Sequence, residues 1–359
     1  MSTRTCTDPD GSVAVVGYAA TPWLRAAQTT TNGVEMLIPL FADVFAQTGL
    51  TKSDIGFWCS GSSDYLAGRA FSFIAAIDSI GAVPPINESH VEMDAAWALY
   101  EAWVKIRTGE IDTALVYGFG KSSAGMLRRT LTMQLDPYTV APLWPDSVSV
   151  AALQARAGID SGAWTEADMA AVAARSLSDA TSNPAAQVSR TVDAETLLAE
   201  PLWADPLRRH DIAPVTDGAA VAILASAERA REIRENPAFI TGLEHRIDSP
   251  ALGSRDLTRS PSTTAAARAA GADGVQLAEL HAPFTHQELI LRSAIGLDDD
   301  VRINPSGGAL VGNPMFSAGL ARIGEAARAV WNGDAERVLA HATGGHALQQ
   351  NLIAVMEAK

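Results

Sequence analysis

Four side chains in this sequence have types and positions that suit acid–base or hydrogen-bonding chemistry. His281 ends an apolar stretch that predicts a buried strand, and layered α/β folds bind their ligands at such strand ends. His346 follows a pair of glycines, and a neutral imidazole is a base well matched to pH 7. Asn313 offers an amide donor, and Asp94 offers a carboxylate base where water is excluded from it.

The titratable candidates also have structural explanations. His281 would then be bonded to a nearby carbonyl, and His346 would lie on a surface turn. Asp94, with Glu92, would supply negative charge to the N-terminus of a helix, where the helix dipole favours it. The sequence favours the functional role for His281 and the helix-terminal role for Asp94, and it leaves the two explanations of His346 open.

Composition excludes several classes of protein. The 359 residues are 47% hydrophobic and 19% charged, which excludes disorder and fits either several domains or one large layered unit. A formal charge of −14 disfavours binding to nucleic acid or to an anionic membrane surface. The two cysteines, Cys6 and Cys59, make neither a disulfide framework nor a cysteine zinc site. We expect no bound metal, no membrane-spanning segment, no signal peptide and a cytoplasmic location.

Apolar runs and helical spacings alternate along the chain, as in an α/β layered sheet. Strands are predicted at 13–19, 55–59, 113–118, 219–225, 238–243, 275–281, 337–342 and 348–357. Helices are predicted at 33–50, 71–80, 91–107, 165–180, 227–234, 262–271, 285–294 and 316–332. Residues 119–205 lose the alternation, which is typical of an inserted lid or subdomain.

Five separated segments resemble the thiolase superfamily. Residues 206–224 (PLRRHDIAPVTDGAAVAIL) are similar to the linker that opens the second half of a thiolase, and residues 93–118 to the nucleophile helix and the strand after it. Residues 279–284 (ELHAPF) resemble the H-D-C-F segment of sterol-carrier-type thiolases. Residues 303–319 (INPSGGALVGNPMFSAG) resemble the glycine-rich block, and residues 339–345 (LAHATGG) take the place of the C-x-G-G segment.

The resemblance implies a fold and a domain division. The fold would be two fused five-stranded α/β halves in a layered αβαβα arrangement with an inserted loop domain. The first half would comprise residues 1–225, with the insertion at about 119–205, and the second half residues 226–359. Within the superfamily the chain looks most like the sterol-carrier and lipid-transfer-like branch, including the shorter lipid-transfer-like thiolases of actinobacterial steroid-degradation clusters.

The departures from the thiolase pattern concern the catalytic residues. No cysteine occurs in residues 92–96, where a thiolase carries its nucleophile, and Ala342 stands in the C-x-G-G segment. Asn313 stands where a histidine is expected before Pro314. Acyl transfer through a cysteine is therefore not expected. The resemblance leaves His281 and Asn313 to stabilise the enolate oxygen of a CoA thioester together, with His346 or Asp94 as the base.

Three functions fit this pattern. The first is retro-aldol cleavage of a β-hydroxyacyl-CoA in the degradation of a cholesterol or bile-acid side chain. The second is a non-catalytic subunit that supports an active thiolase-like partner, and the third is an acetyl-CoA acyltransferase by family alone.

The resemblance also implies ligands and partners. No cofactor would be held tightly, and CoA would enter with the acyl-CoA substrate, contacted by Gly307, Gly308 and Gly312 and by Arg128 and Arg129. We expect a homodimer or a heteromer with another thiolase-like chain, and a DUF35-type OB-fold protein as a further partner.

Overall fold

The computed structural model describes residues 12–24, 33–64 and 71–358. Within them, ten strands join in one sheet with the order β11-β10-β13-β14-β9-β1-β8-β4-β2-β3. The first five in chain order are β1 (Val13–Ala20), β2 (Phe57–Gly61), β3 (Glu88–Val91), β4 (Thr113–Gly120) and β8 (Gly218–Ser226). The second five are β9 (Ala238–Ile247), β10 (Leu277–Glu279), β11 (Arg302–Ile303), β13 (Arg337–Gly344) and β14 (Gln350–Glu357).

The two sets of five strands have the same topology. Numbered within its own set, each half-sheet runs third, second, fourth, fifth, first, and the two first strands, β1 and β9, pair over a short antiparallel stretch. In both sets the second strand pairs in parallel with the third and the fourth, and the fifth pairs antiparallel with the fourth and the first. The predicted fold class of two five-stranded α/β halves is confirmed.

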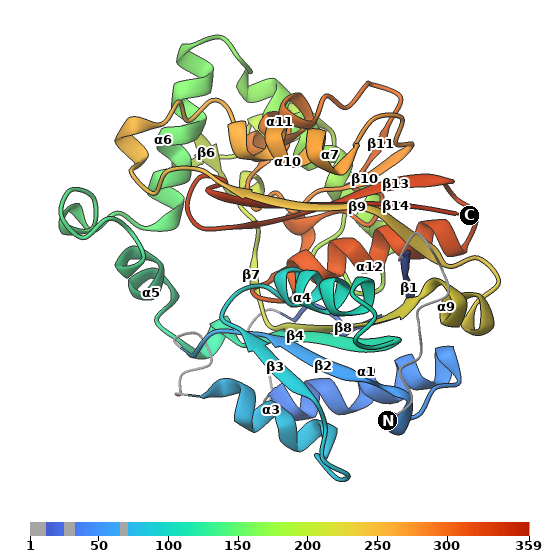
Figure 1. Cartoon of the computed structure of the whole chain (residues 1–359). Coiled ribbons are helices and arrows are strands. Elements are labelled where there is room, and N and C mark those ends of the chain that lie inside the picture. The colour runs from blue at the N-terminus through green and yellow to red at the C-terminus, as the bar shows by residue number, and fades with distance from the viewer. Residues whose placement is uncertain (1–11, 25–32, 65–70, 359) are drawn as a thin grey trace.

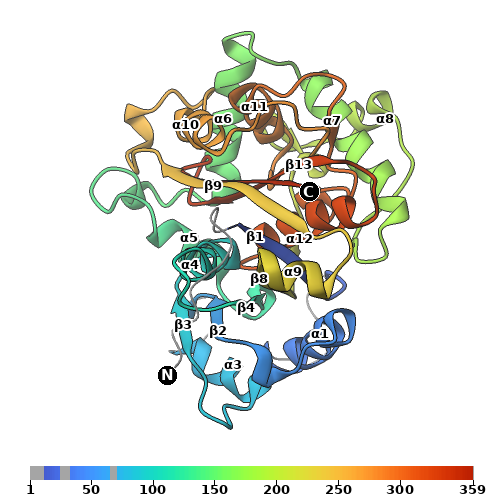
Figure 2. The same cartoon turned by 45° about the vertical axis from the view of Figure 1, so that its right-hand side comes forward.

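Helices cover and separate the two half-sheets, so the molecule has five layers (Figures 1 and 2). The outer faces carry α1 (Gly33–Thr48) and α3 (Ser72–Ile80) on one side, and α10 (Pro261–Ala270) and α11 (Thr285–Ile295) on the other. The central layer holds α4 (Ala95–Arg107) and α12 (Ala318–Trp331), which pack against the inner faces of both half-sheets in one hydrophobic cluster.

Small residues let the central helices approach the sheet closely. At Gly118 in β4, an added Cβ would lie 2.3 Å from the carbonyl oxygen of Phe316 and 2.7 Å from Cβ of Ala95. These two residues lie beside the starts of α12 and α4. The absence of a side chain at Gly118 thus brings both helix N-termini to the end of one strand.

The insertion between β4 and β8 is largely helical. It contains α5 (Leu127–Met133), α6 (Ser147–Asp160), α7 (Glu166–Asp179) and α8 (Ala194–Leu198), of which the sequence predicts only α7. Figure 1 shows α5 lying to the side of the layered body. The remaining elements are α9 (Ala227–Ile233) and the short strands β5 (Leu202–Ala204), β6 (Leu207–Arg208), β7 (Val215–Thr216) and β12 (Asn313–Pro314).

Two predicted boundaries are wrong near the candidate site. The helix predicted from residue 91 begins at Ala95, because Glu88–Val91 forms the edge strand β3 and Asp94 is the helix N-cap. The strand predicted to end at His281 ends at Glu279, so His281 lies in the loop that follows it. In the part of the chain that the structure describes, no helix is both long and apolar enough to cross a membrane.

Candidate active site

Asp94 lies where the two central helices begin and caps both of them. Its Oδ1 accepts hydrogen bonds from the backbone N–H groups of Ala96 (2.9 Å) and Leu320 (3.0 Å), and its Oδ2 accepts one from Gly319 (2.9 Å). Burial raises the pKa of this carboxyl, and the three backbone hydrogen bonds oppose that rise. The positive ends of two helix dipoles therefore meet at one carboxylate, which is the helix-terminal role that the sequence favours for Asp94.

The two segments in which the thiolase resemblance expects cysteines, 92–96 and the one that contains Ala342, approach each other at Gly319. An added Cβ at Gly319 would lie 2.6 Å from Oδ1 of Asp94 and 2.6 Å from Cβ of Ala342. Cys59 lies elsewhere, on β2, with its Sγ 3.7 Å from Oε2 of Glu101, and burial raises the pKa of its thiol. Cys6 lies outside the described residues. Of the described side chains, those next to Gly319 are thus a carboxylate and a methyl group, and no thiol lies among them.

His281 and Asn313, which the sequence predicts to act together, are in contact. Nε2 of His281 lies 2.9 Å from Oδ1 of Asn313, and Nδ1 of His281 lies 3.3 Å from the backbone nitrogen of Thr343. Asn313 is half-buried in the short strand β12, five residues before α12 begins. Burial lowers the pKa of His281 to about 4, and the nearby Arg322 charge adds to that effect. The imidazole is therefore neutral at pH 7.

A buried ion pair lies near His281, and the sequence analysis does not predict it. Nη1 of Arg322 donates to Oε2 of Glu279 at 2.7 Å and to Oγ of Ser306 at 2.6 Å, and both charged side chains are only 1% exposed. Ser306 in turn donates to Glu279 from its hydroxyl group and from its backbone nitrogen. The pair joins β10, the glycine-rich block and α12. A charged residue in the apolar segment 316–332 is the signal that could have revealed it.

Close packing and backbone conformation within the protein explain the glycines of the glycine-rich block, residues 303–319. Gly307 and Gly308 have positive φ angles of 92° and 67°, which glycine adopts most readily. At Gly312 an added Cβ would lie 2.4 Å from the ring of Trp23. All three glycines are buried against protein atoms. Their packing accounts for the block without a ligand, so contact of these three glycines with CoA stays a prediction.

His346, Arg128 and Arg129 belong to the region around α5. Nε2 of His346 lies 2.8 Å from the carbonyl oxygen of Leu131 and donates to it, which leaves Nδ1 as the basic nitrogen. Burial lowers the pKa of His346 from its ordinary value of 6.5. Arg128 is exposed and pairs with Asp146 at 2.9 Å, and Arg129 is exposed. Both arginines are accessible to an anionic ligand, and their contact with CoA phosphates stays a prediction.

Comparison with solved structures identifies the architecture. A structure titled Ltp2-ChsH2(DUF35) aldolase superposes with a TM-score of 0.81 and 19% identity, covering 97% of this chain and 98% of the other. Human mitochondrial 3-ketoacyl-CoA thiolase superposes with a TM-score of 0.77 and 15% identity, covering 97% and 99%. The chain has the thiolase fold.

The chain is also similar in sequence to acetyl-CoA acetyltransferases and to a CoA lyase. An acetyl-CoA acetyltransferase of Methanothermobacter thermautotrophicus is 30% identical over 208 residues, which are 51% of this chain and 54% of that protein. The 17-hydroxy-3-oxo-4-pregnene-20-carboxyl-CoA lyase of Mycobacterium tuberculosis is 26% identical over 242 residues, 64% of this chain and 61% of the lyase. An acetyl-CoA acetyltransferase of Methanocaldococcus jannaschii is 23% identical over 87% of this chain and 88% of the relative.

The chain is thus similar to thiolase-superfamily proteins in fold and over part of its sequence, and no family model matches it. The matched segment spans about half the length of the Methanothermobacter relative.

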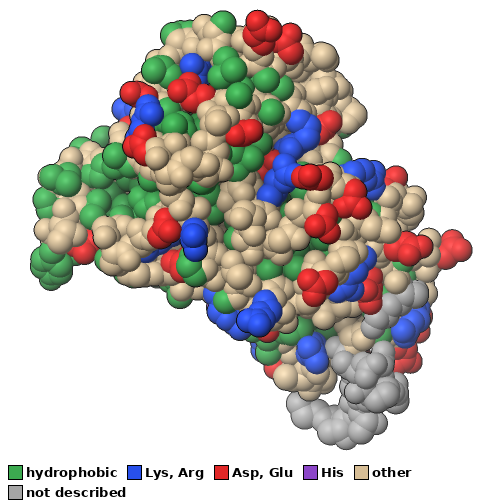
Figure 3. Space-filling view, turned by 90° about the horizontal axis from the view of Figure 1, so that it is seen from above, with side chains coloured by type: hydrophobic (Ala, Val, Ile, Leu, Met, Phe, Trp, Pro, Cys, Tyr) green, Lys and Arg blue, Asp and Glu red, His purple; other side chains and the backbone are tan. Residues whose placement is uncertain are grey.

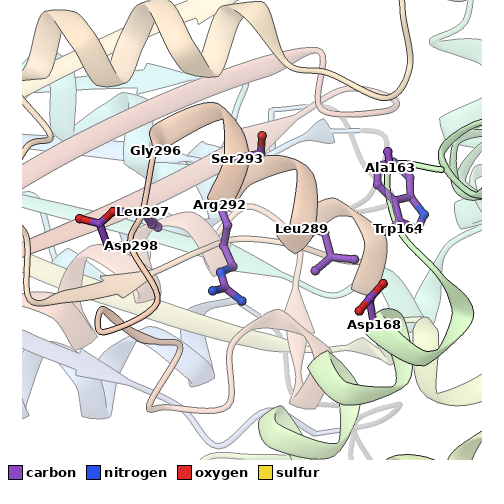
Figure 4. A pocket seen from close by; sticks show the side chains of 9 residues that line it. All are labelled: Ala163, Trp164, Asp168, Leu289, Arg292, Ser293, Gly296, Leu297 and Asp298. Atoms are coloured by element: carbon purple, nitrogen blue, oxygen red, sulfur yellow. The ribbon is translucent and has the colours of Figure 1, made fainter. Parts of the chain in front are cut away.

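An open surface pocket of about 510 Å³ lies away from these residues, between α11 and the turn that leads into α7 (Figure 4). Trp164 and Asp168 line one side, and Arg292 and Asp298 the other. None of the residues predicted from the sequence lines it. The candidate residues predicted from the sequence thus lie outside this pocket.

The double cap makes a prediction about stability. Replacing Asp94 by Ala leaves three buried backbone N–H groups without their acceptor, so we expect a loss of about 2–4 kcal/mol in the free energy of unfolding. Thr165→Ala is the matched control, because Thr165 caps α7 alone and should cost about 1 kcal/mol. Urea denaturation followed by circular dichroism measures both. Equal losses in the two variants would refute the double cap.

Proposed function

We propose that this chain is a lyase that cleaves the Cα–Cβ bond of a β-hydroxyacyl-CoA by a retro-aldol reaction. The observation that carries the proposal is the carboxylate of Asp94 at the starts of α4 and α12, close to Ala342 and with no thiol beside it among the described residues. An acyl-cysteine cannot form there, whereas a retro-aldol reaction needs only a base and a donor to the developing enolate oxygen. The similarity to a CoA lyase and to an aldolase supports the proposal.

The proposed reaction uses only the side chains of this chain, the substrate and water. Nδ1 of His346 removes the proton of the β-hydroxyl group, the Cα–Cβ bond breaks, and the β-carbon leaves as a ketone or an aldehyde. The electron pair of the broken bond forms the enolate of the shortened thioester, whose oxygen accepts a hydrogen bond from this site. The imidazolium of His346 gives its proton back, through water, to Cα of the enolate, which regenerates the neutral base and releases a shorter acyl-CoA. The step therefore needs no oxidant, metal or bound cofactor.

A steroid side chain is the substrate class we propose. The M. tuberculosis lyase is named for a steroid CoA ester, and in that compound the 17-hydroxyl group is β to the thioester. Retro-aldol cleavage of the compound gives a 17-ketosteroid and propionyl-CoA. It is therefore the probe that tests the reaction on this chain.

The test is to incubate the purified chain, alone and with co-expressed partners, with that steroid CoA ester and to follow both products by mass spectrometry. We expect cleavage that survives treatment with iodoacetamide, because Cys59 is buried and lies away from the site. Asn313→Ala should lower kcat by about 10²–10³-fold, the usual effect of removing one donor to an oxyanion.

Thiolysis of acetoacetyl-CoA that iodoacetamide abolishes would contradict the proposal and favour an ordinary acyltransferase. Cleavage by a co-expressed complex that is unaffected by Asn313→Ala would make the chain a supporting subunit.

The role of His346 predicts a pH dependence. A histidine acts as a base only when its imidazole is neutral, and the pKa of His346 lies below 6.5. The value of kcat/KM should therefore stay level from pH 8 down to about 6.5 and fall in more acidic solution. His346→Gln keeps a donor for the Leu131 carbonyl but has no basic nitrogen, and should lose about 10²–10⁴-fold in kcat. A variant that retains the wild-type rate and pH profile would exclude His346 as the base.

We also propose that the chain works in a complex, because residues 126–144, here called the arm, expose a set of large apolar side chains. Five of them are between 55% and 89% exposed: Met126, Met133, Tyr138, Leu143 and Trp144. Hydrophobic side chains gather at the left edge of the space-filling view (Figure 3), the side on which α5 lies in Figure 1. Apolar patches on this scale are typical of interaction sites. The solved Ltp2-ChsH2(DUF35) aldolase supports a DUF35-type partner.

Native mass spectrometry of the chain co-expressed with its encoded neighbours should detect a stoichiometric complex. The double variant Tyr138→Ser and Leu143→Ser should weaken that complex, because it removes apolar area from the arm. Val83→Ser is the matched control, since Val83 is 85% exposed outside the arm. A complex that resists the arm variant, or that responds equally to the control, would contradict the assignment.

A further inference from the structure

We infer that His281 does not contact the substrate and is a positioning residue, which holds the side-chain amide of Asn313 so that its NH2 group serves as the donor to the enolate oxygen. The identity of the ligand oxygen as that of an enolate rests on the proposed function. The orientation of the two side chains rests on geometry alone. It changes the sequence-based expectation in which both residues contact the thioester.

The first step concerns the proton of the imidazole. The backbone nitrogen of Thr343 lies 3.3 Å from Nδ1 of His281. A peptide N–H can only donate, so Nδ1 must present its lone pair. A buried neutral imidazole then carries its single proton on Nε2.

The second step concerns the amide. Nε2 of His281 lies 2.9 Å from the side chain of Asn313. Because Nε2 donates, Asn313 must turn its oxygen toward the ring, since the opposite rotamer would set an N–H group against another N–H group. The tautomer fixed by Thr343 therefore fixes the orientation of Asn313.

The third step concerns the two hydrogens left on Nδ2 of Asn313. Among the residues that the structure describes, none accepts a hydrogen bond from this nitrogen, and the side chain of Asn313 is half-buried and not enclosed. Both ring nitrogens of His281 are occupied by protein groups. Of the two residues, only Asn313 has a donor left for a ligand.

A measurement on the whole chain tests the tautomer without any catalysis. In ¹⁵N-histidine-labelled protein, we expect the Nδ1 signal of His281 to have the shift of an unprotonated nitrogen and the Nε2 signal that of a protonated one, with assignment by loss of both in His281→Gln. On adding the steroid CoA ester, the NH2 signals of Asn313 should shift in a second sample labelled with ¹⁵N-asparagine, whereas the ring nitrogens of His281 should keep their type in the first. A protonated Nδ1 would overturn the inference even if the chain cleaves its substrate.

Two variants of Asn313 and two of His281 add a kinetic test. Asn313→Asp keeps an oxygen for Nε2 and removes the NH2 donor, so its kcat should fall as far as that of Asn313→Ala, by about 10²–10³-fold. His281→Gln can still donate to the Asn313 oxygen and should stay within about tenfold of wild type, whereas His281→Leu should lose more. An active Asn313→Asp, or equal losses in His281→Gln and His281→Leu, would overturn the positioning role.

Discussion

The structure depends on one buried carboxylate that is bonded to the N-termini of two helices from different halves of the chain. Asp94 follows the edge strand of the first half, whereas Gly319 and Leu320 begin the central helix of the second. Isolated in an apolar core, such a charge would be very costly, but the two helix dipoles and three N–H groups stabilise it. The same bonds fix how α4 and α12 meet, and hence where His281, Asn313 and Ala342 lie.

The duplicated topology explains why these groups converge. Each half has the strand order third, second, fourth, fifth, first, and each places one helix in the central layer. The third helix-bearing connection of the first half contains Asp94 just before α4, and that of the second half passes through Asn313 before α12 begins. Two similar units packed face to face therefore bring their corresponding helix N-termini to a common point. The buried pair of Glu279 and Arg322 holds the second unit's loop in place beneath that point.

Much of this arrangement is predictable from the sequence, because buried strands are apolar runs and central helices are rich in alanine. The pairing of His281 with Asn313 follows from the resemblance, as does the expectation that no thiol takes part. Strand β3 was missed since an edge strand pairs on one side only and its sequence, ESHV, needs no apolar alternation. Glu279 and Arg322 lie 43 residues apart, so a charge in the apolar segment 316–332 can be noticed in the sequence but its partner cannot be named. Which nitrogen of His281 carries the proton depends on a backbone group of Thr343, which no residue type reveals.

The hydrogen bond from His346 to the carbonyl of Leu131 has a consequence for control of the chemistry. Leu131 lies in α5, within the arm whose apolar side chains face outward. The protonation pattern of this imidazole is thus set by a segment outside the layered body. A protein that binds the outer side of α5 and shifts the helix by little more than a bond length would break the hydrogen bond to the Leu131 carbonyl. The imidazole of His346 could then rotate or exchange its proton. Assembly and reactivity would then be coupled mechanically, through a single peptide carbonyl.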